Sequence, residues 1–112
     1  MRKIPLKLRD EMESDSFYKQ CCITGRNDEK IEWHHNLIYG GQQVNEKFCI
    51  LPLTDWVHRE IVKHKQKCDW IMWSRASEQE IEKYSKATNY KRELERLNKI
   101  YGTYTNRKST IN

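Results

Sequence analysis

Apolar residues are scarce in this chain, and its apolar runs are all short. Hydrophobic residues make up 37% of the 112 residues and charged residues 33%. This leaves material for only a modest core, which a bound metal could help to hold together. With no apolar run near the roughly eighteen residues of a transmembrane helix, we expect no membrane partner.

The sequence predicts neither a signal peptide nor a zinc site made of cysteines. The basic residues after Met1 are not followed by an apolar segment, so we expect no signal peptide and a cytoplasmic location. The cysteines form no Cys-x-x-Cys pair, which argues against a four-cysteine zinc site and favours reduced, partly buried thiols. They are Cys21, Cys22, Cys49 and Cys68.

The charge balance favours a polyanionic partner. Lysine and arginine number 21 against 16 aspartates and glutamates, giving a formal net charge of +5. Nucleic acid is the commonest partner of a basic surface. A soluble protein that is merely rich in lysine is the alternative.

The hydrophobic spacing predicts a single α+β domain over residues 1–112. We expect a strand over 31–35, a loop over 39–43 around two glycines, and an extended run over 48–51 that ends at Pro52. Helices are expected from Pro5 to Met12, over 54–64, over 68–75, from a capping box at Ser77 and Glu80 to about residue 87, and from 88 or 89 to 101, with Gly102 as the stop.

Three histidines carry the chemical signal. His34 and His35 are adjacent in the predicted strand, so their rings should point to opposite faces. One imidazole could hold a metal while the other takes a proton from water, and His58 on the following helix could complete the metal site. Phosphodiester hydrolysis needs this combination of activated water and neutralised charge.

The surrounding residues resemble the HNH (His-Asn-His) endonucleases of the ββα-metal, or His-Me finger, type, and most closely their small bacteriophage members. The matching segments are Cys-Ile-Thr-Gly at 22–25, Glu-Trp-His-His-Asn-Leu at 32–37, the glycine pair at 40–41, Asn-Glu-Lys at 45–47, Pro-Leu at 52–53, and His58. The resemblance implies a ββα-metal core over 17–64, preceded by a helix. A helical extension over 66–102 and a flexible tail over 103–112 would follow.

The resemblance also implies roles for individual residues. His34 and His58 take the metal-ligand positions and His35 the general-base position. Asn45 takes the place of the motif asparagine that orients the base, with Asn36 as the rival. Two protein ligands leave room for water and phosphate, which suits Mg²⁺ or Mn²⁺, although two imidazoles also attract Zn²⁺ or Ni²⁺.

The chain departs from the family pattern in two ways. It lacks the paired zinc knuckles that many members carry, so we expect its fold to depend on the packing of aromatic residues: Trp33, Phe48, Trp56 and Trp70. It also lacks a second helical ligand, because Val62 occupies the position four residues after His58. His64 lies six residues after His58 and should face elsewhere.

Basic residues follow His58 closely, and they could contact phosphates beside the scissile bond. These are Arg59, Lys63, Lys65 and Lys67. A solvated helix face is an equally good explanation. No segment resembles a base-reading element, so contacts to the DNA backbone are expected.

The leading hypothesis is therefore a hydrolase, a metal-dependent HNH endonuclease that leaves 5′ phosphate and 3′ hydroxyl ends by resemblance. One alternative is a non-catalytic nucleic-acid-binding module on the same scaffold. Another is an accessory nuclease of phage recombination or packaging that requires a phage protein partner. One active site nicks one strand, so double-strand cleavage would need a homodimer or two visits. For a phage-encoded protein, the location would be the bacterial host cytoplasm.

Overall fold

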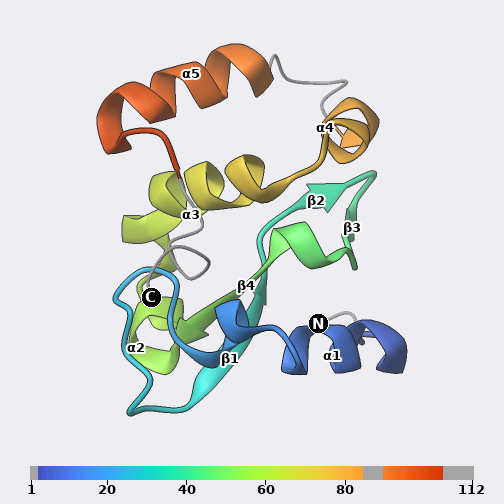
Figure 1. The fold of residues 1–112 in the computed structure, drawn as a ribbon, viewed down its shortest axis with the longest axis vertical. Helices are drawn as coiled ribbons and strands as arrows, with labels where there is room; N and C mark the ends of the chain where they lie inside the picture. Colours follow the sequence, from blue (N-terminus) through green and yellow to red (C-terminus); the bar gives the residue numbers. More distant parts are fainter. Residues whose placement is uncertain (1–2, 85–89, 105–112) are drawn as a thin grey trace.

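The computed structural model of this chain describes residues 3–84 and 90–104 and has an α+β fold, as predicted (Figure 1). Within these residues there are five α-helices: α1 (Leu6–Glu13), α2 (Asp55–Arg59), α3 (Ile61–Arg75), α4 (Glu78–Tyr84) and α5 (Tyr90–Tyr101). The strands are β1 (Ile31–His35), β2 (Ile38–Tyr39), β3 (Gln42–Gln43) and β4 (Ile50–Thr54). Short 3₁₀ turns span Ser16–Lys19 and Lys47–Cys49.

The central sheet is an antiparallel pair of strands, β1 and β4, with His34 opposite Leu51 and Trp33 opposite Pro52. The predicted strand at 31–35 is confirmed. The extended run was expected over 48–51, but residues 47–49 form a 3₁₀ turn and β4 continues through Pro52 to Thr54. A two-stranded sheet has only edge strands, where proline is tolerated, and the carbonyl of Pro52 accepts a hydrogen bond from the Cys22 amide.

The helix after β4 is interrupted. The predicted helices over 54–64 and 68–75 are instead the short α2 and the fifteen-residue α3, separated at Glu60, whose backbone angles are φ −104° and ψ 31°. Neither proline nor glycine marks this break. Consequently His58 lies on α2, while His64 lies on α3.

Two predicted signals for the ends of helices are confirmed. Ser77 and Glu80 form a reciprocal capping box: the Glu80 amide donates to Ser77 Oγ, and the Ser77 amide donates to Glu80 Oε1. Gly102 ends α5 with a positive φ of 87°. The predicted continuation of the fourth helix to residue 87 lies outside the described residues, as do residues 105–112 of the tail that was predicted over 103–112.

The glycine pair forms a hairpin rather than an open loop. Gly40 and Gly41 join β2 to β3 with φ values of 62° and 80°. Two consecutive positive φ angles match the twist of a tight hairpin and strongly favour glycine at both positions.

The larger buried cluster is formed by side chains of α1, β4, α2 and α3, and it includes Met12, Leu51, Leu53, Val57 and Ile71. Trp33 and Trp70 pack at its edge. Phe48 belongs to a smaller cluster with Val44 and Met72. The expectation that Trp56 packs in the core is wrong, since its side chain is 53% exposed on α2.

Helix α5 lies alongside α3 (Figure 1). The Trp70 ring of α3 stacks against Tyr101 and donates a hydrogen bond to Asn98 Oδ1. No helix in the described part of the chain is long and apolar enough to span a bilayer.

Candidate functional site

The rings of His34 and His58 meet between β1 and α2, with their centroids 5.0 Å apart. His34 is the fourth residue of β1, and β4 leads directly into α2, which carries His58. The antiparallel pairing of β1 with β4 therefore brings the start of α2 beside β1. This juxtaposition joins two residues that are 24 positions apart in the sequence.

Glu32 lies on the same face of β1 as His34, because side chains two residues apart on a strand share a face. Its Oε1 lies 2.8 Å from Nδ1 of His58. A carboxylate only accepts hydrogen bonds, so Nδ1 of His58 is the donor. In a neutral His58, Nε2 then carries the free lone pair.

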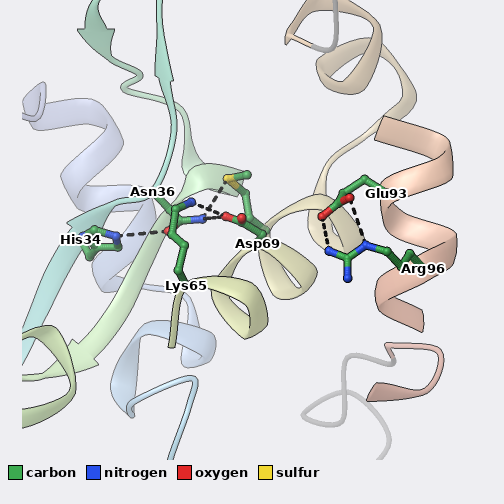
Figure 2. Close-up of polar contacts among 7 residues, drawn as sticks. His34, Asn36, Lys65, Asp69, Glu93 and Arg96 are labelled. Carbon is green, nitrogen blue, oxygen red and sulfur yellow. Dashed lines mark hydrogen bonds and ion pairs between the residues drawn. The ribbon is translucent and has the colours of Figure 1, made fainter. Parts of the chain in front are cut away.

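A second polar chain runs from His34 into α3 (Figure 2). Asn36 lies between His34 and Asp69, with its Oδ1 3.2 Å from Nε2 of His34 and its Nδ2 3.0 Å from Oδ1 of Asp69. Lys65 forms an ion pair with the same Asp69 oxygen at 2.5 Å. Asn36 itself is buried.

His35 points to the other face of β1 and is 6% exposed. Its Nε2 lies 2.7 Å from Oδ1 of Asn45, whose Nδ2 donates to the backbone carbonyl of Lys3 at 2.9 Å. Because the carbonyl of Lys3 only accepts, the amide oxygen of Asn45 faces the ring and Nε2 of His35 is the donor. Within the described residues, the buried Nδ1 of His35 has no hydrogen-bond partner.

Burial, with a smaller contribution from the nearby His58, lowers the pKa of His34 from its ordinary value of 6.5 to about 4. Removing an imidazolium from water is costly, and a second cation beside it adds repulsion. His34 is therefore neutral at physiological pH, which is the form that binds metals.

Two ring nitrogens at this site could hold a divalent ion. The hydrogen bonds leave lone pairs on Nδ1 of His34 and Nε2 of His58, and both rings are neutral when they coordinate. Across the described residues, histidine, cysteine, aspartate and glutamate form no group of three or more that could hold a metal ion. Water or phosphate would have to supply the other ligands.

The basic residues predicted to contact nucleic acid lie on α2 and α3, and three of them are in ion pairs. Arg59 pairs with Asp55 at 3.0 Å, Lys63 with Glu60 at 2.7 Å, and Lys65 with Asp69 at 2.5 Å. Lys67 is half-buried. The positive charge of this surface is thus partly compensated.

His64 contacts Trp56 rather than His34 or His58. Its ring lies 6.2 Å from that of Trp56, in an edge-to-face arrangement.

Sequence reasoning missed Glu32 and Asp69 as partners of the site. Glu32 carried one signal, its position two residues before His34 on a predicted strand. Asp69 carried none, because it is 33 residues from Asn36 and lies on α3, a different element.

No protein-family model, curated protein or solved structure matches this chain.

Proposed function

We propose that this chain is a metal-dependent endonuclease of the HNH type that hydrolyses DNA phosphodiester bonds. The observation that carries the proposal is the meeting of His34 and His58 beside a third histidine, His35, which is oriented separately. The order of the elements agrees with a ββα-metal core, because two paired strands lead into the helix that carries His58.

In this proposal His34 and His58 hold a divalent ion through their unprotonated nitrogens. A bound ion supplies positive charge that stabilises the pentacovalent phosphate and the departing 3′ oxygen. Two imidazoles with several open positions suit Mg²⁺ or Mn²⁺, with Zn²⁺ or Ni²⁺ as alternatives.

His35 is the proposed general base. Its Nε2–H donates to Asn45, so the lone pair on Nδ1 is the one that accepts a proton from the attacking water. This contact favours Asn45 as the orienting asparagine, since Asn36 contacts His34 instead. Nδ1 is buried, so the proposal requires the protein around it to shift and admit water when DNA binds.

DNA would approach the face that carries His58, where exposed cations follow on α2 and α3. Arg59 and Lys63 each pair with a carboxylate of neighbouring sequence, and exposed pairs of this kind contribute little to stability. Phosphate groups could therefore compete for these side chains at small cost. The contacts would be to the DNA backbone and would not select a sequence.

A DNA-binding module that does not cleave is the second candidate. The burial of His35 favours it, because a covered imidazole cannot reach water.

Nicking of supercoiled plasmid separates the two candidates. The nuclease should convert supercoiled to open-circular DNA with Mg²⁺ or Mn²⁺, and EDTA should abolish the conversion. Retarded migration of DNA without nicking under any of Mg²⁺, Mn²⁺, Zn²⁺ and Ni²⁺ would favour the module and contradict the nuclease.

A further inference from the structure

Each of the two histidines that meet between β1 and α2 is connected to a carboxylate. Glu32 accepts directly from Nδ1 of His58 at 2.8 Å. Asp69 is connected to His34 indirectly, through the side-chain amide of Asn36. The two carboxylates come from different elements, β1 and α3, and reach different rings.

The direction of the hydrogen bonds that join Asp69, Asn36 and His34 follows from the carboxylate of Asp69. Asp69 can only accept, so the amide nitrogen of Asn36 must face it and the amide oxygen must face His34. The Nε2 of His34 is consequently the protonated nitrogen. Asn36 is buried, and Lys65 forms an ion pair with Asp69 (Figure 2).

The direct contact with Glu32 selects a different ring nitrogen. Glu32 accepts from Nδ1 of His58, so Nδ1 carries the proton on that ring, whereas Asn36 accepts from Nε2 of His34. The two rings thus offer chemically different nitrogens. Histidine ligands in metalloproteins commonly donate their other ring N–H to a carboxylate or carbonyl, which fixes the tautomer and raises the basicity of the coordinating nitrogen.

The geometry points to Glu32, Asn36 and Asp69 as positioning residues of the metal site. They hold His34 in the Nε2-protonated tautomer and His58 in the Nδ1-protonated tautomer, so that the ion is bound by Nδ1 of His34 and Nε2 of His58. This inference rests on the proposed function, because it assigns supporting residues to the metal site on which that function depends.

The tautomers can be measured without changing the protein. Long-range ¹H–¹⁵N spectra of the metal-free full chain at neutral pH distinguish protonated Nδ1 from protonated Nε2, and His→Gln variants assign each ring. We expect Nε2–H for His34 and Nδ1–H for His58. The reverse tautomer on either ring, or averaging between the two, would overturn the assignment for that ring.

The second test is titration calorimetry with Ni²⁺ on Glu32→Ala and Asp69→Ala. Each should bind roughly 10–100-fold more weakly than the parent. Asp55→Ala and Glu60→Ala are the matched controls, because they also remove a carboxylate from an ion pair near His58, but their partners are Arg59 and Lys63 rather than a proposed metal ligand. They should bind as the parent does.

A conservative variant separates positioning from folding. Glu32→Gln keeps an oxygen that accepts from Nδ1 of His58, so it should retain that tautomer and recover most of the affinity that Glu32→Ala loses. Recovery of the folded state, judged by circular dichroism, without recovery of affinity would contradict the positioning role. If Glu32→Ala does not fold, Asp69→Ala carries the affinity comparison, and the spectra of Glu32→Gln still report the tautomer of His58.

The failures of the two proposals are distinguishable. If His34→Ala and His58→Ala bind Ni²⁺ as tightly as the parent, the metal site is absent and the proposed function fails. If those variants lose binding while Glu32→Ala and Asp69→Ala keep it, only the positioning role is overturned.

Discussion

The Nε2 nitrogen of His35 lies 2.7 Å from the amide oxygen of Asn45, and this contact orients the proposed base. The amide nitrogen of Asn45 is in turn tied to the backbone carbonyl of Lys3, ahead of α1. The base is therefore held through residues that are far apart in the sequence, and its free nitrogen is Nδ1.

Replacing Asn45 should slow cleavage without weakening metal binding. In Asn45→Ala the Nε2–H of His35 loses its acceptor and the ring loses its fixed tautomer. We expect plasmid nicking to fall roughly 10–100-fold, as for other residues that position a catalytic group, and the free energy of unfolding to fall by about 1–3 kcal/mol. Asn27→Ala, at an exposed position outside any helix or strand, is the control. Nicking by Asn45→Ala at the parent rate would exclude an orienting role.

Loss of a proposed metal ligand should weaken metal binding, whereas loss of His64 should not. Calorimetry with Ni²⁺ or Mn²⁺ should show severely reduced affinity for His34→Ala and for His58→Ala, since each removes one of only two protein ligands. His64→Ala should bind like the parent, because that ring packs near Trp56. Equal losses for all three variants would point to a general effect on folding rather than to a site.

The metal-free protein should lose stability in mild acid because of His34. Its pKa is about 4 in the folded protein and near 6.5 when unfolded, so the unfolded state binds more protons between these values. Stability is therefore full above pH 6.5 and falls as the pH decreases toward 4. Urea unfolding in EDTA at several pH values should show this fall, and His34→Gln should flatten it. An equally steep profile in His34→Gln would mean that other groups cause the pH dependence.

Two aromatic residues should differ sharply in their contribution to stability. Phe48 is 3% exposed in the cluster with Met72, and Phe48→Ala should reduce the free energy of unfolding by about 3–5 kcal/mol. Trp56 is largely exposed, and Trp56→Ala should change it by no more than about 0.5 kcal/mol. Thermal unfolding of both variants tests this ranking, and a larger loss for Trp56 would contradict the burial seen here.

Local signals in the sequence predicted local structure well. The alternation at 31–35 predicted β1, and Ser77 with Glu80 predicted a helix start, because both depend on neighbouring residues. The same alternation separated His34 from His35 on the strand. The approach of His58 was expected from its place on the following helix and from the family resemblance.

Features that depend on packing between distant segments were not predictable in the same way. The break at Glu60 has no local marker in the sequence, yet it places His58 on a short helix separate from α3. Trp56 was expected in the core because apolar residues recur around it at helical spacing, but on α2 its side chain is largely exposed. The contact between Asn36 and Asp69 depends on how α3 packs beside the residue that follows β1, which no spacing rule reveals.

The most direct test of the central claim compares plasmid nicking by the parent and His35→Ala in Mn²⁺, with Mn²⁺ affinity measured on the same samples. We predict that His35→Ala binds Mn²⁺ like the parent but nicks at least roughly 100-fold more slowly, because it lacks the general base. Nicking by His35→Ala at the parent rate, with metal binding intact, would contradict the account.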